Sequence, residues 1–145
     1  KEIKMKDIYV IYWSGTGNTE AMAKAVGEGI ESGGAHPVVM EVGSADPQML
    51  SDASVFALGC PAMGSEELEE GEMEPFVSAL EEFVSGKTVG LFGSYDWGDG
   101  EWMRIWAKRM EDAGAKVAGQ GVTANNAPDE EALGACRELG EKLAQ

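Results

Sequence analysis

The segment best suited to binding a ligand is "SGTGNT", residues 14–19, which contains three hydroxyl side chains, one amide and two glycines. It follows an apolar run and precedes a helical pattern. Its backbone N–H groups and the positive end of the helix dipole would therefore face the same point. The glycines allow a tight turn and a close approach of a ligand to the backbone. These features together favour an anion held by neutral donors.

The kind of anion is narrowed by what this segment lacks. No lysine follows it, and its glycine spacing is not G-x-G-x-x-G, so it matches neither the triphosphate loop nor the dinucleotide fingerprint. A single phosphate group fits best, because hydrogen bonds can offset the desolvation of a dianion without a cation in the loop. The alternative is an ordinary helix cap, but a cap requires one such residue rather than five.

Composition excludes several classes of partner. The 145 residues are 43% hydrophobic, which suits one domain with a substantial core. An excess of 26 acidic over 11 basic residues gives a net charge of -15, which repels nucleic acid and anionic lipid and favours a basic protein partner. Apolar stretches are far shorter than the ~20 residues that span a bilayer, and no signal-like segment follows "KEIKMKD". We expect a soluble, cytoplasmic protein without membrane or nucleic-acid partners.

Residues for metal or nucleophilic chemistry are scarce. Cys60 and Cys136 match no zinc or redox spacing, so both are expected to be small core residues. The single histidine, His36, is expected to have a structural or surface role. The sequence thus predicts no metal site and no catalytic residue.

Apolar patterns of strand and helix type alternate along the chain. The expected strands cover residues 7–13, 36–42, 53–60, 87–93 and, more weakly, 115–124. The expected helices run from Asn18 to Gly33, from Pro75 to Gly86, from Trp102 to Ala113, and onward from Pro128. This alternation predicts an α/β fold with a parallel sheet and helices on both faces.

In such sheets, ligands bind beyond the carboxyl ends of the strands. The loops after residues 13, 60, 93 and 124 are therefore the expected site. A phosphoacceptor signalling domain would need acidic residues at the ends of the first and third strands. This chain has Trp13-Ser14 and Cys60-Pro61 there, which argues against that class.

Three of these loops, namely "SGTGNT", "PAMGSEE" (61–67) and "GSYDWGDGEWM" (93–103), together resemble the short-chain flavodoxins. The likeness is greatest to the type from anaerobic bacteria that has Met-Gly in the second loop. It covers about residues 7–144 and implies one flavodoxin-like FMN-binding domain over 1–145, with residues 1–6 as an N-terminal extension. It also implies a three-layer sandwich with a five-stranded parallel sheet in the flavodoxin order 2-1-3-4-5.

This resemblance implies a function as well. It indicates a low-potential one-electron carrier with non-covalently bound FMN, cycling between semiquinone and hydroquinone in place of ferredoxin, and not an enzyme. The implied partners are ferredoxin- or flavodoxin-dependent oxidoreductases with basic patches, and the implied state is a monomer. The alternative is a flavodoxin-like NAD(P)H-dependent FMN or quinone reductase, which the short chain, with no added segment for a nicotinamide, disfavours.

In the second loop, the resemblance places Met63 and Gly64 beside the flavin ring and Glu66 on the flavin N3–H. The Gly64 carbonyl would turn to accept a hydrogen bond from the flavin N5–H after the first electron arrives. Glycine suits this change because the turn types involved require positive φ. The alternative interpretations are a core methionine and a glutamate at a helix start.

In the third loop, Trp97 stands beside Gly98, where the helical pattern requires no large apolar residue. An aromatic side chain on a glycine-rich loop suits stacking on a flat heterocycle, and the resemblance places this residue on the outer flavin face. Trp102 and Trp106 fall on the apolar stripe of the helix and are expected in the core. Trp13 is expected either to border the phosphate or to fill the core.

Two further features concern the cofactor. Family members have Gly where this chain has Asp96, so we expect Asp96 to perturb the loop backbone or to shift the flavin potential. Asn126 matches a ribityl contact of the family, with a cap or turn residue as the alternative. The predicted FMN-binding residues are Ser14, Gly15, Thr16, Gly17, Asn18, Thr19, Pro61, Ala62, Met63, Gly64, Ser65, Glu66, Ser94, Tyr95, Asp96, Trp97, Gly98 and Asn126.

An acidic run follows the second loop. Its members are Glu66, Glu67, Glu69, Glu70, Glu72 and Glu74. Their combined charge is expected to oppose the second reduction of the flavin and to steer basic redox partners. A solvated surface without further role is the alternative.

Overall fold

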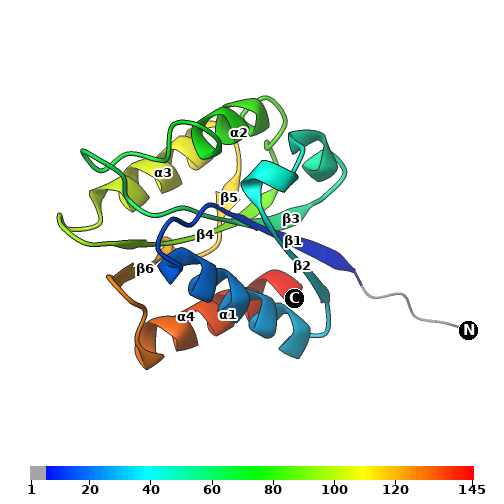
Figure 1. The fold of residues 1–145 in the computed structure, drawn as a ribbon. Helices are drawn as coiled ribbons and strands as arrows, with labels where there is room; N and C mark the ends of the chain where they lie inside the picture. The colour runs from blue at the N-terminus through cyan, green and yellow to red at the C-terminus, as the bar shows by residue number, and fades with distance from the viewer. Residues whose placement is uncertain (1–5) are drawn as a thin grey trace, which may run out of the picture.

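The structure is a computed structural model that describes residues 6–145. These residues form a parallel sheet with helices on both faces (Figure 1). The strands are β1 (Asp7–Tyr12), β2 (His36–Glu41), β3 (Val55–Gly59), β4 (Thr88–Tyr95), β5 (Lys116–Val117) and β6 (Val122–Asn125). Their order is β2-β1-β3-β4-β5, with β6 also paired to β4. The α/β fold and the order 2-1-3-4-5 are thereby confirmed. Apart from Lys6, the predicted N-terminal extension lies outside the described residues.

The fifth strand position differs from its prediction as one strand over 115–124. Lys116 pairs with Thr88 at one end of β4, and Val122 pairs with Phe92 further along it. More residues lie between β5 and β6 than between the β4 residues with which these two strands pair. The residues between β5 and β6 therefore cannot all pair with β4, and they leave the sheet. Gly119 and Gly121 turn the chain there with φ of 70° and 94°, a region that favours glycine. One strand position is thus occupied by two short strands.

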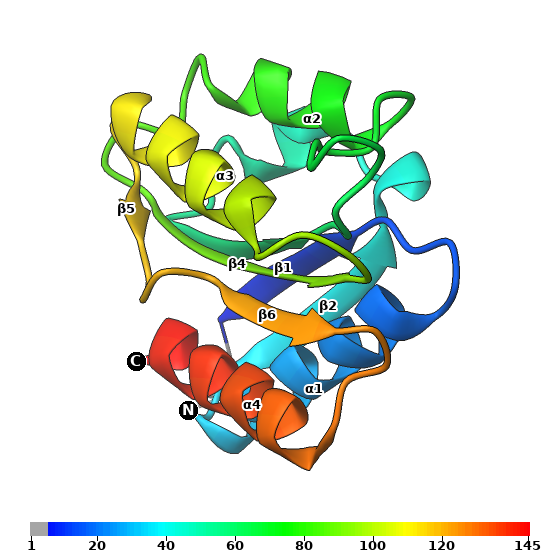
Figure 2. The same cartoon turned by 90° about the vertical axis from the view of Figure 1, so that its left-hand side faces the viewer.

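Two pairs of helices cover the two faces of the sheet. Figures 1 and 2 show α1 (Asn18–Ser32) and α4 (Glu130–Ala144) on one face, with α2 (Met73–Leu80) and α3 (Glu101–Asp112) on the other. Short 3-10 helices, η1 (Val42–Ser44) and η2 (Pro47–Leu50), follow β2. No helix within residues 6–145 has the length and apolarity needed to cross a bilayer.

Each face of the sheet has its own apolar core. Trp102 and Trp106 are buried under α3, as predicted. On the other face α1 and α4 approach so closely that a Cβ on Gly29 would overlap the Arg137 carbonyl oxygen, and one on Gly140 would overlap the Val26 carbonyl oxygen. This contact fixes α1, and with it the loop that precedes α1, against the sheet.

Both cysteines are buried and free, as predicted. Burial raises the pKa of the Cys60 thiol, and separately that of the Cys136 thiol, to about 12. Neither thiol is therefore a thiolate at neutral pH, so both act as apolar packing residues. His36 is exposed at the start of β2.

The second long helix begins and ends earlier than predicted. The sequence pattern places it from Pro75 to Gly86, whereas α2 covers Met73–Leu80. It begins earlier because the Glu69 carboxylate accepts hydrogen bonds from backbone N–H groups at the helix start. After Leu80 the chain continues in turns with i to i+3 bonds, such as that from Phe83 N–H to the Leu80 carbonyl.

Candidate functional site

A cavity of about 270 Å³ opens at the carboxyl ends of the central strands, where loops from β1, β3, β4 and β6 meet. These are the four loops that the sequence predicts. No lysine, arginine or histidine is among the described residues that line it. The lining residues are Trp13, Ser14, Gly15, Thr16, Asn18, Thr19, Pro61, Ala62, Met63, Ser94, Tyr95, Asp96 and Asn126.

Some of the predicted site residues lie beside this cavity rather than on its wall. They are Gly17, Gly64, Ser65, Glu66, Trp97 and Gly98. Gly64 lines an adjoining cavity of about 360 Å³ that it shares with Trp13 and Met63. Trp13 lines both cavities and also packs against the core. Its place directly before Ser14 is the sequence signal for its role.

Hydrogen bonds to the side chain of Ser14 hold the conformation of the first loop, residues 14–19. Ser14 Oγ accepts hydrogen bonds from the N–H groups of Gly17 and Glu20, at 3.1 and 3.3 Å. Gly17 has φ of 97°, which explains a glycine at this position. Asn18 and Thr19 occupy the first turn of α1, where backbone N–H groups have no intrahelical acceptor. The loop therefore presents donors toward the cavity.

A buried hydroxyl pair ties this loop to β4. Thr19 is 1% and Ser94 5% exposed, and their hydroxyl oxygens lie 3.2 Å apart. Both residues line the cavity. The hydroxyl that accepts in this contact keeps its own proton and can donate it to an anion in the cavity, because each hydroxyl offers one proton and two lone pairs.

The second loop closes on itself and on β4. Met63 N–H donates to the Glu67 carbonyl at 2.8 Å, and Glu67 N–H donates to the Met63 carbonyl at 2.9 Å. Ala62 N–H donates to the Ser94 carbonyl at 2.9 Å. Within the loop, Gly64 and Glu66 have φ of 51° and 56°. A left-handed glutamate is uncommon and indicates that the surrounding bonds impose this conformation.

Glu66 reaches from the second loop to the third. A Cβ added to Gly98 would lie 2.8 Å from Glu66 Cδ, so the carboxyl group rests directly on the backbone of the third loop. Glu66 Oε1 is buried and has no hydrogen-bond partner among the described residues. A buried carboxylate oxygen without a donor is costly, so this atom fits a ligand that offers an N–H group.

The third loop carries Asp96 and Trp97. Asp96 is not among the described residues with positive φ. Its exposed side chain adds a carboxylate to the cavity wall. Trp97 is 61% exposed, which leaves the indole available to a ligand.

One member of the acidic run after the second loop, Glu69, is hydrogen-bonded to the backbone at the start of α2. Glu69 accepts hydrogen bonds from the N–H groups of Gly71, Glu72 and Met73 at 2.7, 2.7 and 2.9 Å. Burial raises the pKa of the Glu69 carboxyl, but these three donors outweigh it, and the pKa lies below its ordinary value. The charged form of Glu69 thus holds the start of α2.

This arrangement predicts a pH-dependent stability. Because the folded pKa of Glu69 is below the unfolded one, its stabilisation is complete above an ordinary pKa of 4.5 and is lost as the pH falls through the folded value. Glu69→Gln should lower the free energy of unfolding by about 1 to 2 kcal/mol at pH 7. The gap from the unmodified protein should shrink below about pH 4.5.

Urea unfolding across pH 3 to 7 measures this effect. Glu70→Gln, at an exposed neighbouring position, is the matched control and should unfold like the unmodified protein. A constant gap between Glu69→Gln and the unmodified protein over the whole pH range would contradict the capping role.

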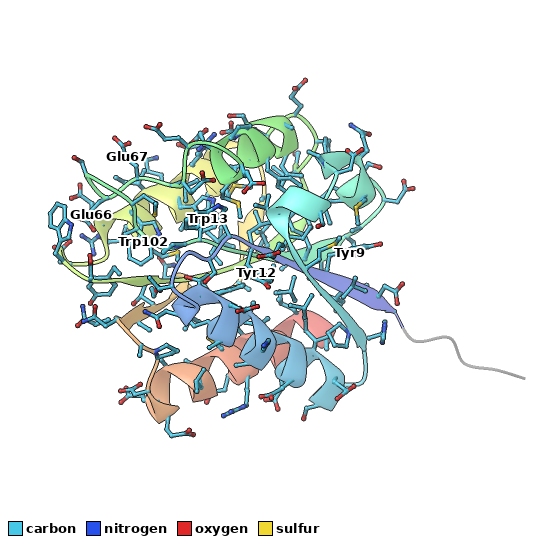
Figure 3. All side chains as sticks on the ribbon, viewed as in Figure 1. Tyr9, Tyr12, Trp13, Glu66, Glu67 and Trp102 are labelled. Atoms are coloured by element: carbon cyan, nitrogen blue, oxygen red, sulfur yellow. The ribbon has the colours of Figure 1, made fainter. Side chains whose placement is uncertain are left out.

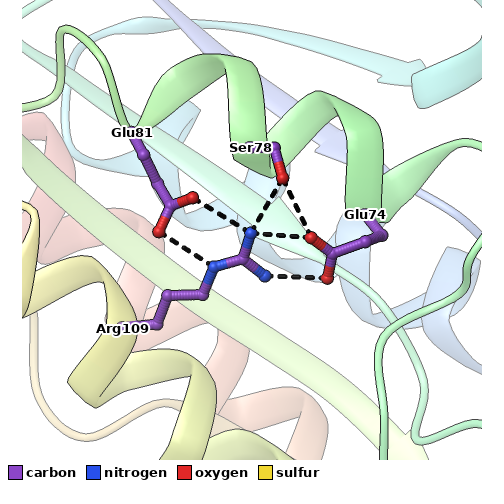
Figure 4. Close-up of polar contacts among 4 residues, drawn as sticks. All are labelled: Glu74, Ser78, Glu81 and Arg109. Carbon is purple, nitrogen blue, oxygen red and sulfur yellow. Dashed lines mark hydrogen bonds and ion pairs between the residues drawn. The ribbon is translucent and has the colours of Figure 1, made fainter.

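Arg109 of α3 joins α2 to α3 at the far end of this segment (Figure 4). Its guanidinium donates to Glu74 and Glu81, with closest distances of 2.7 and 3.0 Å, and to Ser78 at 3.1 Å. Hydrogen bonding to Arg109 lowers the pKa of Glu74. The clamp neutralises part of the acidic surface and holds α2 in place. Its members are too far apart in sequence for residue patterns to predict the contact.

The comparisons with known proteins agree with this geometry. The family model described as Flavodoxin matches residues 10–140. The flavodoxin of Megasphaera elsdenii is 46% identical over 141 residues, covering 95% of this chain and 98% of the relative. The flavodoxin of Clostridium beijerinckii is 44% identical, covering 93% and 97%. The solution structure of two-electron reduced M. elsdenii flavodoxin superposes with a TM-score of 0.87 over 94% of this chain and 98% of that one.

Proposed function

This chain belongs to the flavodoxin family, and from that membership we propose how its cavity holds FMN and how its loops act on the cofactor. The protein is a low-potential one-electron carrier with non-covalently bound FMN, not an enzyme. When bound, FMN supplies the ring system that takes up and releases electrons one at a time. The reductase alternative has no support in the comparisons.

The phosphate of FMN is assigned to the first loop, and this is the observation that carries the proposal. Its first-turn N–H groups, its hydroxyls and the Ser94 hydroxyl face a cavity without a cationic side chain. Such a site binds a single phosphate through hydrogen bonds and the helix dipole. The donors are already held in place by Ser14 and by the Thr19–Ser94 contact, so little ordering is required on binding.

The flavin ring is assigned to the space between the second and third loops. The unpartnered Glu66 Oε1 would accept the N3–H of the flavin, which satisfies a buried acceptor. Met63 would contact one face of the ring and the exposed Trp97 the other. The complete proposed set is Trp13 together with the residues predicted from the sequence: Ser14, Gly15, Thr16, Gly17, Asn18, Thr19, Pro61, Ala62, Met63, Gly64, Ser65, Glu66, Ser94, Tyr95, Asp96, Trp97, Gly98 and Asn126.

Gly64 would tune the first electron transfer. Its carbonyl oxygen would accept the flavin N5–H that exists only after the first electron arrives, and a differential contact of this kind shifts a potential. The backbone at Gly64 has φ of 51°, and a Cβ there would meet no atom within 4 Å. The requirement for glycine is therefore one of backbone conformation and not of space.

Gly64→Ala should lower the potential of the first one-electron couple by roughly 40 mV, which corresponds to about 1 kcal/mol for a residue with Cβ at positive φ. Spectroelectrochemical titration of the FMN-loaded protein measures the shift. Gly34→Ala is the matched control, because Gly34 also has positive φ and free space but lies in the turn after α1. Equal potentials in Gly64→Ala and Gly34→Ala would remove the carbonyl contact from the mechanism.

We further propose that the whole chain forms one FMN-binding domain that works as a cytoplasmic monomer with basic-patched redox enzymes. Electron transfer to redox partners is the function of the family. A net charge of -15 supports partners with basic surfaces, because opposite charges steer association. The large apolar side chains exposed among residues 6–145 are only Val39, Trp97 and Ile105, which supports a monomer.

A further inference from the structure

The second loop leaves the sheet at Cys60, and the carbonyl of this residue is held by a side chain far away in sequence. Trp102 Nε1, on α3, donates to the Cys60 carbonyl oxygen at 3.1 Å in a buried contact. Trp102 is 2% exposed, and its position relative to Glu66 and Trp13 is shown in Figure 3. A Cβ on Gly93 would overlap the same carbonyl oxygen, so the oxygen is enclosed on that side as well.

The same indole also supports the third loop. The rings of Tyr95 and Trp102 have centroids 5.5 Å apart and planes inclined by 51°, an aromatic contact. Tyr95 lies on the cavity wall at the end of β4. Trp102 therefore contacts both Cys60, where the second loop begins, and Tyr95, which directly precedes Asp96.

Trp106 provides an internal comparison. It lies on the same helix and is 1% exposed, yet its Nε1 has no hydrogen-bond partner among the described residues. Both indoles fill the same core beneath α3. They differ in that only the N–H of Trp102 is bonded to the backbone at the start of a cofactor loop.

We propose that Trp102 is a positioning residue for the flavin, acting through the Cys60 carbonyl on the segment Pro61–Glu67. This inference rests on the proposed function. With the hydrogen bond, the segment begins in one orientation, and Ala62 and Met63 can form their bonds to Ser94 and Glu67. Without it, the loop visits other orientations, and the apparent affinity for FMN falls with the fraction of competent loops.

The test compares Trp102→Phe with Trp106→Phe. Each replacement puts a smaller ring in a buried indole site, so both should lower the melting temperature, but only the first removes a hydrogen bond. In the FMN-free chain, amide hydrogen exchange at Ala62, Met63 and Glu67 should be about three- to tenfold faster in Trp102→Phe than in Trp106→Phe. In FMN titrations, the dissociation constant should rise in Trp102→Phe alone, by at most this factor, because it scales with the inverse of the fraction of competent loops.

Equal exchange rates at these three amides in the two variants would overturn the proposal, as would equal FMN affinities. A failure of the proposed function looks different, since the unmodified protein would then not bind FMN. The exchange measurement on the FMN-free chain would still decide whether Trp102 orders the loop. Should Trp102→Phe not fold, exchange of the indole N–H in the unmodified protein replaces it, and rapid exchange at Trp102 would contradict the bond.

Discussion

Replacing Asn18 with aspartate should weaken FMN binding more than a hundredfold while leaving riboflavin binding almost unchanged. Asn18 is the first residue of α1 and lines the cavity. A carboxylate there would face a dianionic phosphate in a partly enclosed site, and such like-charge contacts cost several kcal/mol. Riboflavin lacks the phosphate and so has no charge to be repelled.

The same substitution should not harm the fold. An acidic side chain in the first turn of a helix is favourable by about 0.3 to 1 kcal/mol, because it meets the positive end of the helix dipole. The FMN-free variant should therefore melt at the same temperature as the unmodified protein or slightly higher. An unchanged or higher melting temperature together with a lower FMN affinity would show that the substitution removes the phosphate site and does not destabilise the fold.

Fluorescence titrations with FMN and riboflavin measure the two affinities. Asn18→Ala serves as the control, because it removes the amide without adding a charge and should lose far less than the aspartate variant. A loss of riboflavin affinity as large as the loss of FMN affinity would show that the phosphate does not occupy the first loop.

Replacing Trp97 with alanine should raise the FMN dissociation constant by roughly 5- to 150-fold. Stacking of an aromatic side chain on a flat heterocycle contributes about 1 to 3 kcal/mol. The indole is 61% exposed, so its removal from the FMN-free protein should change the melting temperature little. The effect on binding would therefore come from the lost ring contact.

Two controls define this result. Trp97→Phe keeps an aromatic face and should recover most of the affinity. Ile105→Ala removes an exposed apolar side chain of α3, 55% accessible, and should bind FMN as the unmodified protein does. Unchanged affinity in Trp97→Ala would place this side chain away from the flavin.

Local signals in the sequence predicted most of the frame. The glycine-rich loop before Asn18 and the Gly33–Gly34 pair bound α1 as expected, whereas α4 begins at Glu130 with Asp129 as its cap, later than the predicted start at Pro128. These features depend on neighbouring residues, which a single sequence displays. The predicted end of α2 at Gly86 was wrong, since the helix ends at Leu80 and turns follow it. These turns depend on packing as much as on residue type, and a single sequence does not display packing.

The candidate site was predictable where its residues follow strand ends, and less so where they depend on contacts across the fold. Residue types alone predict that the first loop holds a phosphate, and the structure places this loop on the cavity wall. Other features depend on segments that are distant in sequence. They are the position of the Glu66 carboxylate on the third loop, the hydrogen bond from Trp102 to Cys60 and the ion pairs of Arg109. Nothing in the spacing of these residues indicates which partner each one meets.

We propose that this chain binds FMN in this cavity and transfers single electrons. Spectroelectrochemical titration of the purified protein loaded with FMN tests it most directly. We predict two separated one-electron steps, with the second at a lower potential than for free FMN because the surrounding carboxylates oppose added negative charge. A single two-electron step, or a protein that does not retain FMN, would show that the chain is not a one-electron FMN carrier.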